Sequence, residues 1–491
     1  MPQASDLLAS YRDATPVAPE DVARDYLASG RVLVVLDDDP TGTQSVADLP
    51  VLTRWEVDDF RWAFELRIND RPAAAVYVLT NTRSLDAAEA AERNRQVVTA
   101  ALAAADDAGL SIAFVSRGDS TLRGHFPLEP DVIARTIADL GGESIDGVVI
   151  VPAFPDAGRV TIGSEHYLLA DGYLTPVADT EFARDATFGF STSNLPAYVE
   201  EKTGGRVRAE EVITLDLDTV RSDAATIATA IQPAQNSTPI VVDIVTEDDL
   251  RSLAQGLEEA QRQGKSLLYR VGPPFVRARI GQRPRSPLTA EEVYEDDSHR
   301  IDGAKDTGGL IVVGSHVGLT TRQLDRLTAA HERAQIVELD VQQILDVDTA
   351  AAYIDHSVNV VVEALGHGDV ILHTSRLLIR TDSPAESLRI SRAVSAGVVA
   401  VVNRTLHTYP PRFVIAKGGI TSSDVAAYGL EIRRALVRGP MLPGIVSLWE
   451  ALEGPAKGIP YVVFAGNVGD DDSLLEVTRK LSFYLSEDRA G

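Results

Sequence analysis

Three adjacent carboxylates follow a short apolar run in the segment VLVVLDDDPTGTQ, residues 32–44. The run from Val32 to Leu36 is too short for a helix and is typical of a parallel strand buried on both faces. Pro40 and Gly42 then force a turn, so the acids lie at the carboxyl end of a central strand, where open α/β sheets bind ligands. Neighbouring like charges repel unless a cation or a proton lies among them. The segment therefore predicts an α/β fold and a functional site.

Apolar runs of this kind recur and alternate with helical stretches. We expect strands at 32–36, 74–79, 112–115, 148–151, 239–242, 267–269, 310–313, 336–339, 370–372, 413–416 and 461–464. Helices are expected at 84–107, with Ser84 as N-cap, and at 246–263, 385–402 and 474–485. This alternation predicts mostly parallel sheets flanked by helices. The irregular stretch 152–196 is longer than a connector needs, so it is expected to be functional or to contain further elements.

The alternation stops between Gly281 and Gly308, in a stretch rich in proline and acidic residues. The chain of 491 residues is long enough for more than one domain. We therefore expect one domain at 1–285, a linker or exposed insert at 286–307, and a second domain at 308–491. The active site is expected in the cleft between the two domains.

Composition excludes several classes of function. The net charge of −26 argues against binding to nucleic acid or to an anionic membrane. The absence of cysteine excludes disulfides, thiolate catalysis and cysteine metal sites. No apolar run approaches the ~18 residues of a membrane span, and Met1 to Glu20 lacks the apolar core of a signal peptide. We expect a cytoplasmic enzyme without a protein-bound metal; a homo-oligomer is left open.

Polar residues follow the strands of the first half. In SRGDSTLRGH, residues 116–125, Arg117 and Arg123 could grip a carboxylate bidentately. Asp119 and Ser120 could read substrate hydroxyl groups. Arg83 and Arg159 also follow apolar runs, and Thr41 follows the three acids. The predicted substrate site comprises Thr41, Arg83, Arg117, Asp119, Ser120, Arg123 and Arg159.

Glycine and hydroxyl residues follow three strands of the second half, at 314–315, 417–421 and 466–469. Glycine at such turns lets backbone N–H groups approach phosphate oxygens, and a helix beginning near Ser422 or Ser423 would add its dipole. The predicted nucleotide site comprises Ser315, Lys417, Gly418, Gly419, Thr421, Gly466, Asn467 and Gly469. No G-x-x-x-x-G-K-[ST] occurs and no G-x-G-x-x-G follows a strand, so neither a P-loop nor a Rossmann dinucleotide site is supported.

Five motifs occur in a fixed order along the chain: DDPTG at 38–42, DSTLRG at 119–124, PAFP at 152–155 with Gly158-Arg159, Gly314-Ser315, and KGGIT at 417–421. Together they resemble the four-carbon acid sugar kinase family, over roughly residues 30 to 480. The resemblance implies a substrate-binding N-terminal domain and a nucleotide-binding C-terminal domain. It also implies ATP-dependent phosphorylation of the terminal hydroxyl of a tetronate, such as threonate, erythronate or an oxo-tetronate, in carbohydrate catabolism.

The resemblance assigns the residues to two regions. Asp38, Asp39, Arg83, Asp119 and Arg123 fall in the substrate region, and Ser315, Gly418, Gly419 and Gly466 in the nucleotide region. We expect Arg83, Arg117 and Arg123 to hold the sugar-acid carboxylate. Asp38 or Asp39 would orient the attacking hydroxyl and accept its proton. Mg²⁺ would bridge the phosphates of ATP, retaining water ligands.

Two other classes of protein fit parts of the sequence. Asp37 and Asp39 have the spacing of the nucleophile motif of haloacid-dehalogenase-type phosphatases, and Asp470 to Asp472 resemble their second acid pair. That alternative leaves DSTLRG and the glycine turns unexplained. The other alternative is a non-catalytic protein that binds a sugar acid without phosphoryl transfer.

Overall fold

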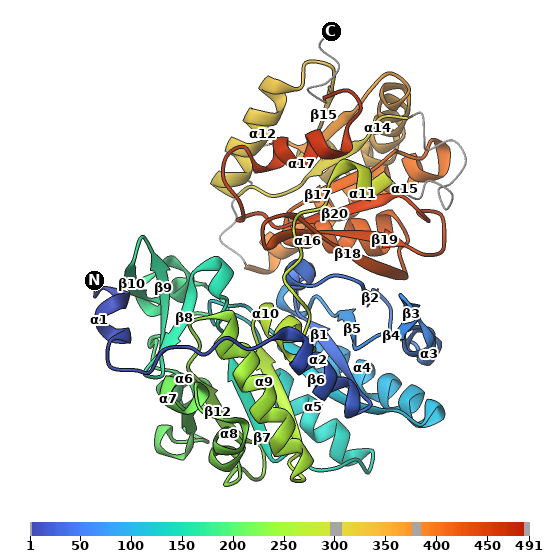
Figure 1. Ribbon diagram of the computed structural model, residues 1–491. Helices are drawn as coiled ribbons and strands as arrows, with labels where there is room; N and C mark the ends of the chain where they lie inside the picture. The colour runs from blue at the N-terminus through green and yellow to red at the C-terminus, as the bar shows by residue number, and fades with distance from the viewer. Residues whose placement is uncertain (1, 295–306, 376–383, 486–491) are drawn as a thin grey trace. The chain divides into compact units, whose positions relative to one another are not determined.

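The computed structural model describes residues 2–294, 307–375 and 384–485. The chain forms two compact units. Unit 1 comprises residues 1–50 and 54–284, and unit 2 comprises residues 51–53 and 285–491. Figure 1 shows a central sheet with flanking helices in each unit. In the described part of the chain, no helix is both long enough and apolar enough to cross a membrane.

The main sheet of unit 1 is parallel throughout. Its strands lie in the order β11 (Ile213–Leu215), β12 (Thr238–Val242), β7 (Gly147–Val151), β13 (Leu267–Val271), β6 (Ser111–Arg117), β1 (Arg31–Asp37) and β5 (Ala75–Leu79). Leu33, Val34 and Val35 of β1 are fully buried. Burying each such side chain contributes about 1.5–3 kcal/mol, which explains why the apolar run forms a central strand.

Two groups of helices flank this sheet. One group contains α2 (Pro19–Ala28), α8 (Ala224–Ile231), α9 (Glu247–Arg262) and α10 (Pro274–Arg279), and the other contains α3 (Val57–Glu65), α4 (Ala87–Ala108) and α5 (Leu128–Asp139). Asp86, whose side chain accepts a hydrogen bond from the Glu89 N–H, is the N-cap of α4. The prediction of Ser84 as N-cap is therefore wrong, because Ser84 ends a separate 3₁₀ turn, η2 (Thr82–Ser84). Thr246 caps α9 with a reciprocal capping box, as its sequence predicts.

The long stretch 152–196 contains a small antiparallel sheet. Its strands are β8 (Arg159–Ile162), β9 (Glu165–Ala170) and β10 (Tyr173–Pro176). Val160, Ile162 and Leu174 pack with Ala4 of α1 (Ala4–Leu8) in a core separate from the main sheet. The prediction of further elements in this stretch is confirmed, and β8 places Arg159 at its first residue.

Unit 2 has a mixed sheet. Its strands lie in the order β18 (Arg434–Leu442), β19 (Ile445–Ala451), β20 (Pro460–Phe464), β17 (Val414–Lys417), β14 (Leu310–Val313), β16 (Val370–Thr374) and β15 (Gln335–Leu339). The last five strands are parallel, whereas β18, β19 and β20 pair antiparallel. Residues 51–53, which include the end of β2 (Leu49–Leu52), lie beside β18, and the Thr53 N–H donates to the Arg433 carbonyl at 3.2 Å.

Helices also flank the sheet of unit 2. α12 (Gly318–Ala330) packs with α17 (Ser473–Leu481), and α14 (Ala350–Leu365) packs with α15 (Pro384–Thr408) (Figure 1). Part of the expected linker is structured: Leu288 is buried in the core of unit 2, and α11 spans Ala290–Tyr294. Residues 295–306 lie outside the described residues.

Candidate functional site

Three neighbouring strands of unit 1 bring the predicted substrate residues to one edge of the sheet. Asp37 is the last residue of β1, and it lies in register with Arg117, the last residue of β6, and with Leu79 of β5. The turn after β5 carries Arg83, and its N–H donates to the Asp38 carbonyl at 3.2 Å. Because parallel strands end at the same edge, acids and arginines that are far apart in the sequence become neighbours.

Asp38 and Arg83 form a buried ion pair. Arg83 Nη2 lies 2.7 Å from Asp38 Oδ1, and Arg83 Nε lies 3.4 Å from Oδ2. Asp38 is 1% exposed. This two-point contact fixes the orientation of both side chains, as is usual for an arginine–carboxylate pair.

Asp37 and Arg117 form a second buried pair, and both side chains are 2% exposed. Burial raises the pKa of Asp37 to about 7, although the nearby Arg117 guanidinium opposes this rise. The other Arg117 donors reach the Asp39 and Gly118 carbonyls. Arg117 is therefore buried, and its guanidinium is bound by the Asp37 carboxylate and by two backbone carbonyls.

Asp39 is the most exposed of the three acids, with 18% of its side chain accessible. Its Oδ1 accepts hydrogen bonds from the Thr41 N–H at 2.9 Å and the Thr41 hydroxyl at 2.5 Å. Its Oδ2 lies 3.6 Å from Arg83 Nη1. Burial works to raise the pKa of Asp39, but the positive charges of Arg83 and Arg117 outweigh burial and leave that pKa lowered. Asp39 is therefore a charged carboxylate that solvent reaches.

The loop after β6 presents a second acid and its partners. Asp119 Oδ2 accepts hydrogen bonds from Arg123 Nε at 2.7 Å and from the Thr121 hydroxyl. The Arg123 guanidinium also lies 5.0 Å from the centre of the Phe182 ring. Burial favours a raised pKa for Asp119, but Arg83 and Arg123 overcome it and hold that pKa well below its usual range.

His166 supports this loop from below. The fully buried imidazole contacts the Ser120 carbonyl through Nε2 at 2.8 Å and the Thr161 hydroxyl through Nδ1 at 2.9 Å. Burial lowers the pKa of His166 to about 4, so the ring is neutral at physiological pH. The contact with His166 therefore holds the backbone of Ser120 in place.

Arg159 is a half-buried arginine whose guanidinium is only partly bound by the protein. Among the residues that the structure describes, no carboxylate forms an ion pair with it, and its buried Nε has no hydrogen-bond partner. Its Nη1 donates to the Ala157 carbonyl. Burial lowers the pKa of Arg159. The Asp119 carboxylate opposes this effect, and the Arg123 guanidinium adds to it. An anion bound beside this guanidinium would satisfy it.

Two glycines of the motifs are required by close packing. A Cβ on Gly42 would collide with the Asp37 carboxylate and the Arg117 guanidinium. Gly124, at φ +122°, would place a Cβ 3.0 Å from Asp38 Oδ2. The glycines therefore allow the backbone to lie directly against the charged pairs.

Sequence reasoning missed two charged residues beneath this site. Arg270 of β13 donates through Nη1 to Glu129 Oε2 at 2.6 Å and to the Ser116 hydroxyl at 2.8 Å. Glu129, in the first turn of α5, also accepts a hydrogen bond from the Thr82 hydroxyl at 2.5 Å. A charged residue inside the otherwise apolar strand LLYRV was the available signal for Arg270.

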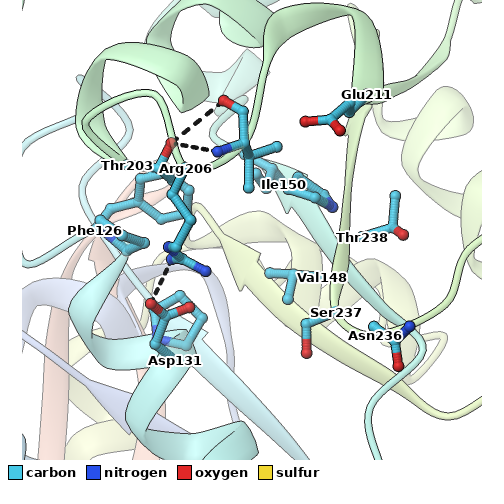
Figure 2. A pocket seen from close by; sticks show the side chains of 14 residues that line it. Phe126, Asp131, Val148, Ile150, Thr203, Arg206, Glu211, Asn236, Ser237 and Thr238 are labelled. Carbon is cyan, nitrogen blue, oxygen red and sulfur yellow. Dashed lines mark hydrogen bonds and ion pairs between the residues drawn. The ribbon is translucent and has the colours of Figure 1, made fainter.

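A cavity of about 250 Å³ in unit 1 contains none of the predicted site residues. Val148 and Ile150 of β7 and Phe126 supply apolar walls, and Arg206 pairs with Asp131 at its rim (Figure 2). The charged motifs therefore do not lie in this pocket.

In unit 2 the turns after three adjacent strands meet. Val313 of β14, Lys417 of β17 and Phe464 of β20 are in register, so Ser315, Gly418 and Gly466 follow at the same edge. A Cβ on Gly466 would lie 2.7 Å from Ser315 Oγ, and one on Gly418 would lie 3.1 Å from Thr421 Oγ1. Thr320 of α12 donates to the Gly466 carbonyl at 2.7 Å. The result is a cradle lined mainly by backbone.

The remaining predicted nucleotide residues lie in and around this cradle. Gly419 begins α16 (Gly419–Asp424), so the expectation of a helix start near Ser422 or Ser423 is wrong by one turn. Gly469, at φ +83°, packs against Ser473, and Asn467 is exposed. The glycine turns therefore follow neighbouring strands at one edge of the sheet, with the exposed Asn467 beside them.

Lys417 lies beneath the cradle and is fully buried. Its Nζ donates to the Ala465 carbonyl at 2.6 Å and lies 3.8 Å from the centre of the Phe464 ring. Burial lowers the pKa of Lys417 to about 7. The Lys417 ammonium group therefore contacts the turn that contains Gly466 and is shielded from solvent.

The two sites differ in their chemistry. The unit 1 site combines a partly exposed carboxylate, Asp39, with Arg159, which has no ion-pair partner among the described residues; this suits an anion that also carries a hydroxyl group. The unit 2 cradle offers backbone groups and hydroxyls, which suit phosphate oxygens. Across the described ranges, no three His, Asp or Glu side chains are grouped to hold a metal ion.

Comparison with known proteins matches both units. Residues 33–279 match the family described as the sugar-binding N-terminal domain, and residues 310–474 match the nucleotide-binding C-terminal domain. The chain is 24% identical over 459 residues to D-erythronate kinase of Heliobacterium modesticaldum, covering 90% of this chain and 95% of that protein. It is 26% identical over 456 residues to D-threonate kinase of Bordetella bronchiseptica, covering 92% and 98%. A crystal structure from Salmonella typhimurium LT2 has the same fold, with a TM-score of 0.63 at 20% identity, covering 92% of this chain and 99% of that one.

Proposed function

Since the chain belongs to the four-carbon acid sugar kinase family, we propose that it transfers the γ-phosphoryl group of ATP to the terminal hydroxyl of a four-carbon sugar acid. The substrates we expect are threonate, erythronate or an oxo-tetronate. One observation carries the proposal: a partly exposed, charged Asp39 lies in the same unit as Arg159, which forms no ion pair with any residue that the structure describes. A hydroxylated carboxylic acid supplies a partner for each.

Unit 1 would bind the sugar acid through charge. The substrate carboxylate would pair with Arg159 and Arg123, and the Asp119 carboxylate would accept a hydrogen bond from a substrate hydroxyl. Hydrogen bonds between ionised partners are about twice as strong as neutral ones, so this arrangement favours acids over neutral sugars. Arg117, which is paired internally, would contribute by holding Asp37 and the Asp39 backbone.

Asp39 would accept the proton of the attacking hydroxyl. Its greater exposure supports this role over Asp38, whose two oxygens both contact Arg83. Phosphoryl transfer needs little from the protein beyond positioning and charge stabilisation, so a low pKa is acceptable in a residue that orients the hydroxyl. Arg83, shared by Asp38 and Asp39, would fix the direction of the carboxylate.

Unit 2 would bind the nucleotide. The turns of Ser315, Gly418 and Gly466 would hold the phosphates with backbone N–H groups, and the Thr421 hydroxyl would donate to the same oxygens. Magnesium, bound to ATP, would neutralise charge on the phosphates. Lys417 would act on these turns through Ala465.

Product identification tests the proposal. The wild-type protein is incubated with Mg-ATP and each of the stereoisomeric threonates and erythronates, and ³¹P NMR follows the products. A phosphate monoester resonance that splits with the protons of a terminal CH₂ group is the expected result. Inorganic phosphate as the sole new resonance would contradict the proposal and favour hydrolysis.

A further inference from the structure

Arg270 lies in the sheet directly below the loop that carries Asp119. It is in register with Ser116 of the neighbouring strand β6, and it is 7% exposed. Its Nη1 donates to Ser116 and to Glu129, and Glu129 accepts from Thr82. Thr82 immediately precedes Arg83. One buried ion pair therefore connects β13, β6, α5 and the turn that presents Arg83.

The loop backbone approaches the Arg270 guanidinium closely at two glycines. A Cβ added to Gly118 would lie 2.5 Å from Arg270 Cζ and 2.7 Å from Nη2. A Cβ added to Gly124 would lie 2.8 Å from Nη2 and 3.0 Å from Asp38 Oδ2. Such distances are well inside van der Waals contact. Arg270 alone therefore crowds a side chain at Gly118, whereas at Gly124 the φ of +122° and Asp38 favour glycine as well. The guanidinium is thus the surface on which the loop of Asp119 rests.

We propose that Arg270, paired with Glu129, is a positioning residue of the sugar-acid site, which sets the loop from Gly118 to Gly124 and the turn of Arg83 for substrate binding. This inference rests on the proposed function. Arg270 would act through the residues it supports: Asp119 on the loop, and Arg83 through Glu129 and Thr82. The guanidinium binds Ser116 and Glu129 through Nη1, and its Nη2 and Cζ atoms lie close to Gly118 and Gly124.

A purely stabilising role would not require this pair. Replacing a buried ion pair by apolar residues is often neutral or stabilising, so burial alone is weak support for a stability role. Unit 1 also offers a matched control in Arg279 and Glu258, which are 1% and 3% exposed and 2.6 Å apart. Arg279 contacts Gln261 and the Tyr26 ring, and none of these residues belongs to the motifs.

The first test compares Arg270→Met with Arg279→Met in the full chain. We expect Arg270→Met to lower kcat/KM for the sugar acid at least about tenfold, mainly through KM, with calorimetric affinity for ADP unchanged. Arg279→Met should change thermal stability and leave both kinetic constants near wild type. Arg270→Lys and Glu129→Gln carry the same test if the methionine variant does not fold. Unchanged kinetics in the folded Arg270 variants would overturn the inference.

The second test is a double-mutant cycle between Gly118 and Arg270. Gly118→Ala alone should reduce kcat/KM, because its methyl group meets the guanidinium. In an Arg270→Ala background the methyl group has room. The kcat/KM of the double variant should therefore be at least about tenfold higher than the value obtained by multiplying the effects of the two single substitutions. This ratio corresponds to a coupling energy of about 1.4 kcal/mol. Independent effects would contradict the proposed contact. A wild type inactive on every sugar acid would instead overturn the proposed function, and this inference with it.

Discussion

At the scale of residues, three consecutive acids have three different environments. Asp37 is buried against Arg117 with a pKa raised to about 7, Asp38 is buried against Arg83, and Asp39 is partly exposed with a lowered pKa. Environments that separate neighbouring carboxyl groups in this way assign them different roles. The buried position of Asp37 also argues against the phosphatase alternative, which needs it as an accessible nucleophile. Asp470 to Asp472, its expected partners, belong to unit 2.

Replacing Asp39 by Asn tests the proton acceptor. The amide keeps the shape but cannot accept the proton, so we expect kcat to fall by about 10²–10⁴-fold. Affinity for ADP, measured by calorimetry, should stay at the wild-type value. Asp156→Asn is the control, since this partly exposed acid of unit 1 pairs with Arg277. A kcat within twofold of wild type for Asp39→Asn would remove Asp39 from the mechanism.

Replacing Arg159 by Gln tests the carboxylate site. A hydrogen bond to a charged group contributes about 1.5–3 kcal/mol, so KM for the sugar acid should rise roughly ten- to hundredfold. The matched control is Arg206→Gln, because Arg206 is exposed and already paired with Asp131. Steady-state kinetics at saturating ATP give the KM of each variant for the sugar acid. An equal change in the two variants would show that the effect is not specific to Arg159.

At the residue scale, the sequence predicts which types of residue lie at the site, but it does not predict the direction in which each side chain points. It correctly brings Asp38 and Arg83 to one sheet edge, because both follow buried parallel strands. It predicts that Arg117 faces the substrate, whereas Arg117 ends β6 in register with Asp37 and pairs with it. Which way an arginine points depends on strand register, and register is set by contacts between distant segments.

At the scale of elements, all eleven strands expected from apolar runs form parallel ladders. Parallel strands are buried on both faces, so they are continuous apolar runs in the sequence. The antiparallel strand β18 was missed because Arg434 and Arg438 interrupt its apolar pattern. β11 was missed because the polar, exposed Thr214 interrupts its short apolar run.

The turn after β17 gives a test of the nucleotide cradle. Gly418 has φ +126°, a conformation that costs an alanine strain, and a Cβ there would crowd Thr421 and Ser315. Gly418→Ala should raise KM for ATP at least about tenfold, equivalent to about 1.4 kcal/mol, and leave calorimetric affinity for the sugar acid unchanged. Gly454→Ala is the control, with positive φ but its nearest neighbour at 3.7 Å. Equal KM for ATP in the two variants would contradict the cradle.

The strand β17 also predicts a pH-dependent stability. Below pH 7, Lys417 is charged in the folded and unfolded chain, and the cost of burying that charge is fully present. Between pH 7 and its ordinary pKa of 10.5, only the folded chain loses the proton, so stability rises by about 1.4 kcal/mol per pH unit from this group. Lys417→Met removes this contribution.

The stability of Lys417→Met relative to wild type should therefore decrease from about pH 7 to about pH 10. Denaturant unfolding of both proteins across this range measures the difference. Loss of the hydrogen bond to the Ala465 carbonyl adds a constant offset, so the slope is the informative quantity. A difference that does not vary with pH would show that Lys417 does not titrate in this range.

At the scale of the whole molecule, the chain contains one unit for each substrate of a kinase. Unit 1 contains nearly all of the match to the sugar-binding family, and unit 2 contains the match to the nucleotide-binding family. The net charge of −26 makes locally positive groups such as Arg159 necessary for an anionic substrate to bind. Sequence motifs predict both functions, because each motif follows a strand; the supporting pair Arg270 and Glu129 required the three-dimensional structure.

The most direct measurement of the central claim is ADP release by the wild-type protein, in a coupled assay with Mg-ATP and a panel of threonates, erythronates and oxo-tetronates. A parallel reaction without ATP measures phosphate release from sugar phosphates. The account predicts ADP release that depends on one of the sugar acids and no phosphate release in the parallel reaction. Phosphate release without ATP, together with no sugar-dependent ADP release, would contradict it.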